Sequence, residues 1–260
     1  MAKASFLSLI GSNPLVAAAI HDGHEVRSEV RRLLAIGDEE RRREEDPYTG
    51  LLTDIAETRW VALRSRFEVD LNRPRDKAVY RRPEDAWGLR VWKRPPSAAF
   101  VDRSLALYDA FYSHVEQTLE GILARHGRFI VLDLHSYNHR RRGPGLAPAP
   151  ATENPEINIG SGSVNLRRWG RVIDQFVEQL RSADFLGRRL DVRENVKFMG
   201  GHFARWAHQR FKDAGLVIAV DIKKFFMNEW TSELDEVQFQ AIHEALRWSA
   251  GILMEAKRVA

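Results

Sequence analysis

Apolar positions along the chain follow two kinds of pattern. Short uninterrupted apolar runs, typical of buried strands, alternate with longer segments in which apolar residues recur every three or four positions, as in amphipathic helices. We expect strands at 15–20, 60–63, 66–71, 129–134, 157–159, 195–199 and 216–222, and helices at 26–43, 101–125, 166–182, 202–212 and 234–257. This alternation predicts an α/β fold of three layers, with a mixed, mostly parallel central sheet flanked by helices.

The segment 66–73, which includes the strand expected at 66–71, has an unusual polar pattern for a strand. If it is extended, its polar side chains share one face; they are Arg66, Glu68, Asp70 and Asn72. That face is either exposed on an edge strand or part of a buried, mutually paired network near a site. The following Arg73, together with Asn72, is a candidate for binding a substrate carboxylate, since a guanidinium can hold both carboxylate oxygens.

The segment 140–155 is rich in proline, glycine and arginine. Strand-like sequence resumes directly after it, which favours a mobile loop or lid over a linker between domains. No internal repeat is present, so we expect residues 1–260 to form a single domain.

Composition narrows the class of protein. The chain has 260 residues, of which 44% are hydrophobic and 29% charged, as in ordinary soluble globular proteins. No apolar stretch approaches the ~18 residues of a membrane span, and the N-terminal segment does not resemble a cleaved signal. Cysteine is absent, which excludes disulfide scaffolds, thiolate zinc sites and cysteine nucleophiles and agrees with a cytoplasmic location.

The formal net charge of +4 is mild. The arginine run 41–43 is flanked by glutamates, so its charge is locally neutralised. Nucleic-acid binding is therefore not expected, and neither is a membrane partner, so a pocket for a small-molecule anion is the functional alternative to a solvated, salt-bridged surface. The pattern predicts no particular oligomeric state.

Two histidines follow strand-like runs. His21 comes directly after 15–20, and His135 comes directly after 129–134. Chemistry in open α/β sheets gathers beyond the carboxyl ends of the strands, so the two imidazoles are expected to reach one pocket. Two histidines and a carboxylate, with one position left for water, form the ligand set of a catalytic zinc.

The third ligand has more than one candidate. His24 lies three residues after His21, close enough for both to approach one ion within a turn. The acidic run 44–46 offers Glu45 or Asp46 as the carboxylate instead. The pattern of residues leaves this choice open.

Asp221 ends the apolar run 216–221. A carboxylate at the end of a buried strand needs a partner or a function. Lys223 or Lys224 would pair with it in the first case. In the second, Asp221 would act as a general base that takes a proton from metal-bound water.

Two adjacent glycines, Gly200 and Gly201, precede the helix expected at 202–212. Glycines allow a backbone to approach a ligand closely, and the amides at a helix start can bind an anion. A plain loop explains the glycines equally well, but Arg205 nearby makes this a second candidate anion site.

Together these stretches resemble the N-formylglutamate amidohydrolase family over most of the chain. The most specific matches are Asp70-Leu71-Asn72-Arg73-Pro74 and Asp133-Leu134-His135-Ser136. Weaker matches are Ile20-His21-Asp22-Gly23, the acidic Glu45-Asp46, Gly200-Gly201 and the strand that ends at Asp221.

The resemblance implies a fold similar to the zinc carboxypeptidases and aspartoacylases (phosphorylase/hydrolase-like). It also implies a metal-dependent hydrolase that cleaves the amide of an N-acylated amino acid such as N-formylglutamate. His21, Asp46 and His135 then correspond to the ligands of one Zn²⁺, and Asn72 and Arg73 correspond to the pair that binds the substrate carboxylate.

The resemblance also places Asp221 where the family usually has glutamate as the general base. Arg66 and Arg205 are expected to assist in binding the substrate. The chain departs from the family at the first histidine, where Ile20-His21-Asp22-Gly23-His24 replaces Pro-His-Ser-Gly, and at 44–48, where Asp-Thr-Asp-Trp is absent.

The expected function is therefore that of a divergent zinc-dependent amidohydrolase. Two alternatives remain: a carboxypeptidase-like peptide hydrolase with the same metal, and a non-catalytic protein that binds a small anion or a partner on the same fold.

Overall fold

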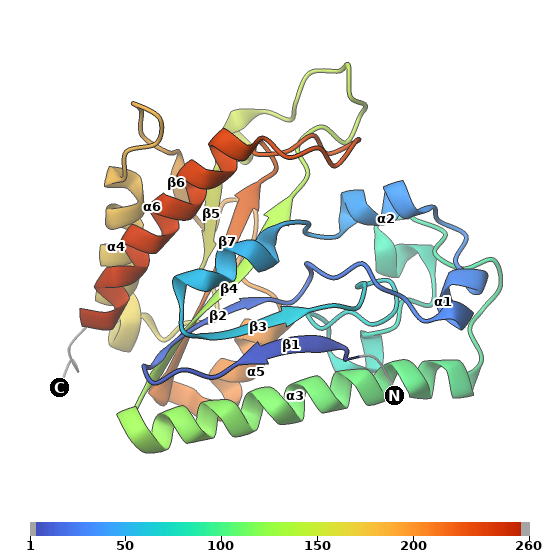
Figure 1. Cartoon of the computed structure of the whole chain (residues 1–260), viewed down its shortest axis with the longest axis horizontal. Coiled ribbons are helices and arrows are strands. Elements are labelled where there is room, and N and C mark those ends of the chain that lie inside the picture. Colours follow the sequence, from blue (N-terminus) through green and yellow to red (C-terminus); the bar gives the residue numbers. More distant parts are fainter. Residues whose placement is uncertain (1–3, 256–260) are drawn as a thin grey trace.

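The computed structural model describes residues 4–255. Its centre is a seven-stranded sheet in the order β1-β3-β2-β4-β7-β5-β6, covered by helices on both faces (Figure 1). The strands are β1 (Phe6–Leu9), β2 (Leu15–Ala19), β3 (Thr58–Ala62), β4 (Phe129–Tyr137), β5 (Ile157–Gly160), β6 (Val192–Glu194) and β7 (Gly215–Lys223). The predicted α/β class with a mixed sheet is confirmed.

The middle of the sheet is parallel. β3, β2, β4 and β7 run in one direction, whereas β1 and β5 are antiparallel to their neighbours β3 and β7. Parallel strands need crossover connections that cover the faces of the sheet. The carboxyl ends of β2, β4 and β7 therefore meet at one edge.

The helices form the outer layers. α4 and α6 pack on one face, and α3 and α5 pack on the other (Figure 1). The helices are α1 (Ser28–Leu33), α2 (Asp38–Glu44), α3 (Ala98–His126), α4 (Leu166–Ser182), α5 (His202–Phe211) and α6 (Glu236–Glu255), and the short 3₁₀ segments are η1 (Thr49–Ile55), η2 (Arg75–Lys77), η3 (Pro83–Ala86), η4 (Ala151–Glu153) and η5 (Lys212–Ala214). The predicted bounds of α4 agree with the structure.

β4 is the central strand, and all nine of its residues are buried. Successive side chains of a strand point to opposite faces. Ile130, Leu132 and Leu134 accordingly join the core under α4 and α6, whereas Phe129 and Val131 join the core under α3 and α5. Burial on both faces explains why this strand is apolar throughout rather than alternating.

The long polar segment 75–96, called the excursion below, has a small core of its own. Tyr80 and Trp92 pack there with Phe67, Val30 and Phe100 of the neighbouring segments. The excursion is thereby fixed against α1 and the start of α3, beside the sheet.

The prediction of one continuous helix at 26–43 is wrong. The structure has two short helices, α1 and α2, separated by the segment 34–37. Leu34 forms a bridge with Trp92, and the amide of Ala35 donates to the carbonyl of Val91. Gly37 then precedes α2 in an extended conformation. Pairing with the excursion thus replaced the helical hydrogen bonds.

The strand predicted at 66–71 is also wrong, because the chain forms turns there. The amides of Glu68 and Val69 both donate to the carbonyl of Ser65, as in one turn of a helix. Arg66 and Asp70 are paired on that turn, while Glu68 pairs instead with Arg27. Of the two interpretations of this polar segment, the buried, paired network is therefore the one that the structure supports.

The strand predicted at 195–199 lies three residues too late. β6 ends at Glu194, and Asn195 has a left-handed backbone conformation with φ of 53°. The next amides, of Val196 and Lys197, donate to Oδ1 of Asn158. The side chain of Asn158 in β5 thus takes the place of a neighbouring strand as the acceptor for these amides.

The short edge strand β1 was not predicted. No helix among residues 4–255 is long and apolar enough to cross a membrane.

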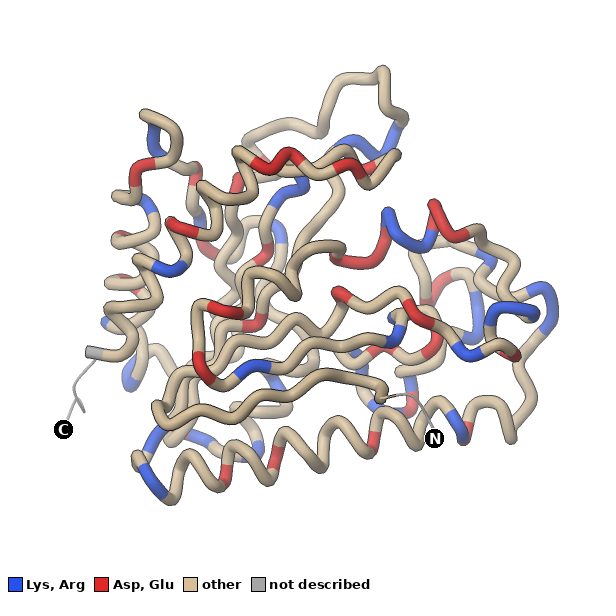
Figure 2. The backbone as a smooth tube through the Cα atoms, viewed as in Figure 1, with Lys and Arg blue, Asp and Glu red and all other residues tan. Residues whose placement is uncertain are grey.

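Charged residues of both signs are interspersed along the backbone (Figure 2). This distribution agrees with the small net charge of the chain.

Candidate metal centre

Three buried side chains meet at the carboxyl ends of β2 and β4. His21 follows β2, Asp46 follows α2, and His135 lies near the end of β4; one ligand atom from each lies within 4.8 Å of the others. Oδ2 of Asp46 is 3.0 Å from Nδ1 of His135 and 3.5 Å from Nδ1 of His21. Both imidazoles therefore present Nδ1 to Oδ2 of Asp46.

Local backbone bonds hold Asp46 in this position. Its amide donates to the carbonyl of His21 at 2.9 Å, and its own carbonyl accepts from the Thr49 hydroxyl at 2.7 Å. The acidic segment is thereby tied to the residue that carries the first imidazole.

The other nitrogen of each imidazole faces a second carboxylate. Nε2 of His21 lies 2.7 Å from Oδ1 of Asp70, and Nε2 of His135 lies 3.1 Å from Oδ2 of Asp133. Metal-binding histidines commonly donate their second N–H to a carboxylate, which fixes the tautomer and the ring orientation. For His21 we assign the Nε2 proton on this basis, which leaves its Nδ1 available as a ligand.

The charges of the site are strongly coupled. Burial alone would raise the pKa of Asp46, but His135 and His21 outweigh it and hold this pKa well below its ordinary value. Burial likewise opposes ionisation of Asp70, but Arg66 and His21 keep the pKa of Asp70 far below normal. Burial would lower the pKa of His135, yet Asp133 and Asp46 raise it well above its ordinary value.

This donor set fits a divalent metal such as zinc. Ligand atoms around a tetrahedral zinc, with bonds of about 2.0–2.2 Å, lie about 3.4 Å apart, close to the two separations from Asp46 Oδ2. Both carboxylate oxygens of the fully buried Asp133 also lack a hydrogen bond. A buried site with such a surplus of carboxylate oxygen favours a cation.

The two other candidates for the third ligand, His24 and Glu45, do not face the histidine pair. His24 is exposed and is not in the group formed by His21, Asp46 and His135. Glu45 is buried, but its carboxylate bonds to Arg41 and to the Ser65 hydroxyl rather than to an imidazole. Burial raises the pKa of Glu45 to about 7. Among the three candidates for the third ligand, the structure brings Asp46 to the histidines.

Asp221 is buried beside this group. It is directly opposite His135 in the register of β4 and β7, and Asn158 of β5 donates to its Oδ2 at 3.1 Å. Burial raises the pKa of Asp221 to about 7. The lysines proposed as its partners bond elsewhere: Lys223 donates to the carbonyl of Asn154, and Lys224 donates to carbonyls near α2.

The arginines proposed for substrate binding are engaged to different degrees. The guanidinium of Arg66 bonds to Asp70 and Tyr80 and stacks on Trp87. Arg73 is 38% exposed and makes only long contacts, at 3.4 Å to the carbonyl of Asp85 and 3.9 Å to Asp70. It therefore retains donors for an incoming anion.

Asn72 connects the site to the start of α5. Its Nδ2 lies 3.3 Å from Nε2 of His135, and its Oδ1 accepts from the amide of Phe203 at 2.9 Å. The helix start proposed as an anion site is thus bonded to Asn72. Arg205 is exposed, and its guanidinium donates to the carbonyl of Gly200 at 2.9 Å.

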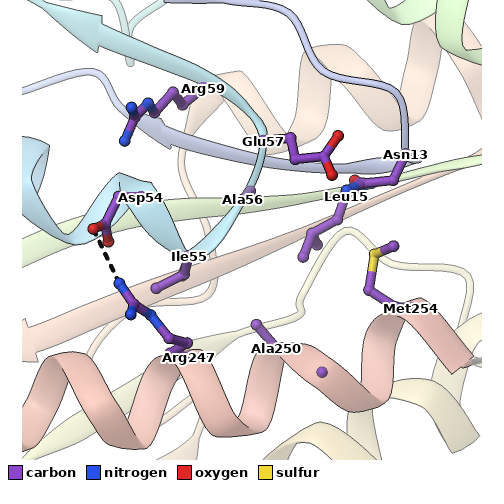
Figure 3. A pocket seen from close by; sticks show the side chains of 11 residues that line it. Asn13, Leu15, Asp54, Ile55, Ala56, Glu57, Arg59, Arg247, Ala250 and Met254 are labelled. Atoms are coloured by element: carbon purple, nitrogen blue, oxygen red, sulfur yellow. Dashed lines mark hydrogen bonds and ion pairs between the residues drawn. The ribbon is translucent and has the colours of Figure 1, made fainter.

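A cavity of about 480 Å³ lies at the amino ends of β2 and β3, away from these residues (Figure 3). Leu15, Arg59 and Arg247 are among its lining residues, and Arg247 is paired with Asp54. Neither this cavity nor a second one of about 350 Å³ includes any of the grouped histidines or Asp46 in its lining.

Sequence reasoning missed the carboxylates behind the two imidazoles. Asp133 lies two residues before His135, and the period of a strand places both on one face, so this signal was present. The sequence pattern places Asp70 on a polar face but does not connect it with His21. No sequence signal indicated that Lys224 would bond to the acidic segment rather than to Asp221.

Comparisons with known proteins identify chains of similar sequence pattern and fold. No curated protein sequence matches the chain. Among solved structures, the chain is similar to an N-formylglutamate amidohydrolase from Ralstonia eutropha JMP134, with a TM-score of 0.75, 18% identity, and coverage of 98% of this chain and 100% of that one. It also resembles the gene product Atu2144 from Agrobacterium tumefaciens, with a TM-score of 0.65, 15% identity, and coverage of 94% and 91%.

At these identities the structural matches establish the fold alone. A sequence model of the family described as N-formylglutamate amidohydrolase, however, matches residues 13–224. This range includes both histidines, Asp46 and Asp221. The chain therefore belongs to the N-formylglutamate amidohydrolase family.

Proposed function

We propose that this protein is a zinc-dependent amidohydrolase that cleaves the amide bond of an N-acylated amino acid such as N-formylglutamate. The observation that carries the proposal is the convergence of Nδ1 of His21 and Nδ1 of His135 on Oδ2 of Asp46. A zinc ion held by these three residues would polarise the scissile carbonyl and lower the pKa of water from about 16 towards 7.

The chain's own residues have separate roles in this proposal. Asp221 would accept the proton of the attacking water and transfer it to the leaving amine, because it is a buried carboxyl beside His135 whose pKa lies near neutrality. Asp70 would hold the imidazole of His21 in place through Nε2, and the charge of Asp133, 3.1 Å from Nε2 of His135, would favour the second imidazole at this position. Arg73 would bind the substrate carboxylate and so orient the amide.

Arg66 would act differently from Arg73. Its donors are used by Asp70 and Tyr80, so it supports the carboxylate behind His21. This support keeps the buried Asp70 ionised, as the pKa of Asp70 indicates.

The first test is metal content. We expect about one zinc per chain in the purified protein, as a single catalytic site would hold, and its loss in His21→Ala, Asp46→Asn and His135→Ala. His24→Ala is the matched control: its side chain is exposed and lies three residues from His21. Zinc bound by wild type but lost in His24→Ala would contradict the ligand set. Wild type without zinc, even after reconstitution, would contradict the proposal.

The second test is a substrate panel of N-formyl, N-acetyl and peptidyl amino acids. We expect turnover of N-formyl or N-acetyl amino acids, and a loss of kcat of about 10²–10⁴-fold in Asp221→Asn with zinc retained. Arg73→Met is expected to raise KM more than it lowers kcat. Cleavage of peptides alone would favour the carboxypeptidase-like alternative, and zinc binding without turnover would favour a non-catalytic binding protein.

A further inference from the structure

Lys224 is a buried cation outside the proposed ligand set. It follows β7 directly and is only 1% exposed. A charged group that loses its water must find partners inside the protein. Its N–H groups therefore need acceptors in the surrounding chain.

The acceptors are two main-chain carbonyls next to the ligand Asp46. Nζ of Lys224 donates to the carbonyls of Arg43 and Glu45, both at 2.7 Å. Arg43 lies in the last turn of α2, and Glu45 is the C-terminal cap of that helix. A cation at this position also complements the partial negative charge of the helix end.

The main chain of Lys224 is fixed to a different part of the site. Its amide donates at 3.0 Å to the carbonyl of Tyr137, two residues after His135. It also lies three residues after Asp221. One residue thus connects the strands that carry His135 and Asp221 with the segment that carries Asp46.

The charge of Lys224 suits this position. Burial lowers its pKa to about 8, while the carboxylates of Asp46 and Glu44 favour the charged form. The ammonium form therefore predominates at neutral pH. Lys223, by contrast, is half-buried and bonds to the carbonyl of Asn154, away from the acidic segment.

We propose that Lys224 is a positioning residue of the metal centre, which sets the place of Asp46 relative to His135 through the carbonyls of Arg43 and Glu45. The inference rests on the proposed metal site. The ammonium of Lys224 bonds to main-chain carbonyls rather than to the side chain of a proposed ligand, and its removal would leave two carbonyls of the acidic segment without this donor.

The test compares Lys224→Met with Lys223→Met, because methionine keeps an apolar stem and removes the donors. We expect the zinc Kd of Lys224→Met to rise about 10–100-fold, as is typical when a residue that orients ligands is lost, and the Kd of Lys223→Met to stay that of wild type. Competition with a chromophoric chelator measures both. An unchanged Kd in Lys224→Met would overturn the inference.

A second readout needs no metal. The amide of Asp46 is bonded to the carbonyl of His21. Hydrogen exchange of peptide 43–47 in the metal-free protein therefore reports on how firmly Lys224 holds this segment. We expect faster exchange in Lys224→Met and wild-type exchange in Lys223→Met. Wild-type protection in Lys224→Met would contradict the inference. A wild-type protein that binds no zinc would instead contradict the proposed function, and this readout would still apply.

Rescue separates the ammonium from other effects of the substitution. The chain has no cysteine, so Lys224→Cys creates a single site. Alkylating the unfolded variant with 2-bromoethylamine and refolding it restores an ammonium on a side chain of similar length. We expect recovery of zinc affinity, and failure to recover it in a folded protein would count against the inference. If Lys224→Met does not fold, Lys224→Gln replaces it, with the same expected direction of Kd.

Discussion

Asp70 is the carboxylate that joins the most partners at the proposed site. It lies 2.7 Å from Nε2 of His21, accepts from Arg66 and the amide of Asn72 at 2.8 Å each, and bonds to the Tyr80 hydroxyl. Four partners allow a fully buried carboxylate to remain ionised. The orientation of His21 therefore depends on residues drawn from the turn at 66–72 and from the excursion.

Gly201 shows how closely α5 approaches this network. A Cβ atom at this position would lie 2.2 Å from both Nδ2 and Oδ1 of the Asn72 side chain. The side chain of Asn72 in turn contacts His135 and the amide of Phe203. The glycine is needed here for space, since its φ of −86° is open to any residue.

We therefore expect Gly201→Ala to destabilise the protein by about 1–3 kcal/mol, the usual cost of forcing atoms into a packed region, and to weaken zinc binding through Asn72. Gly121→Ala is the control, because nothing lies within 4 Å of its Cβ position in α3. That variant should gain about 0.5–1 kcal/mol in helix stability. Urea unfolding measures both, and equal effects at the two positions would contradict this explanation.

At the scale of elements, the register of β4 and β7 determines which polar residues meet. His135 is paired with Asp221, and Asp133 lies on the same face of β4 two residues earlier. β5 adds Asn158, which is paired with Asp221 from the other side. A shift of one residue in either pairing would move these side chains to the opposite face of the sheet.

A second element contact joins α6 to the segment after Asp46. Asp54 of η1 bonds to His243 and Arg247 of α6. Partial burial opposes ionisation, but these two partners outweigh it and lower the pKa of Asp54. The contact therefore favours the folded state most when Asp54 is charged.

The sign of the pH dependence follows from that lowered pKa. The stabilisation is fully present above the unfolded-state pKa of about 4 and is lost as the pH falls through the folded-state value. We expect Asp54→Asn to lower the free energy of unfolding at about pH 6 and to differ much less from wild type at about pH 3. Urea titrations at both pH values test this, and a difference independent of pH would rule it out.

At the scale of the molecule, two cores lie on opposite faces of one sheet, and a third, smaller core lies beside it. The core under α4 and α6 and the core under α3 and α5 share β2, β4 and β7, and the core of the excursion borders α3. Continuous packing of this kind favours cooperative unfolding. The single domain expected from the sequence remains a prediction.

We expect one unfolding transition for the metal-free protein. Trp169, Trp60 and Trp92 lie in the three cores in turn, so tryptophan fluorescence reports on all of them. Its urea midpoint should coincide with that of far-ultraviolet circular dichroism. Separate midpoints would indicate that the excursion or another part unfolds independently.

The proline-rich segment 140–155 is anchored at its start. Arg141 forms two bonds of 2.9 Å with Glu44, and the amides of His139 and Arg140 donate to Glu229. Glu44 lies two residues before Asp46. These contacts place the beginning of the segment beside the proposed site, and its mobility remains a prediction.

Local patterns in the sequence determined much of this protein. The apolar runs at 129–134 and 216–222 specify strands, because only burial on both faces of a sheet suits them. The periodic segment 166–182 specifies a helix with the observed bounds. The ends of the apolar runs at 15–20, 129–134 and 216–221 also made His21, His135 and Asp221 candidate site residues.

Only the tertiary structure decided how the proposed site is completed. The choice of Asp46 over His24, the pairing of Asp70 with His21 and the bonds from Lys224 to Arg43 and Glu45 all join residues far apart in the chain or depend on a turn. Contacts with the excursion likewise divided α1 from α2, against the helical pattern. Periodicity records which face of an element is buried, but it contains no information on which distant segment will supply the partner.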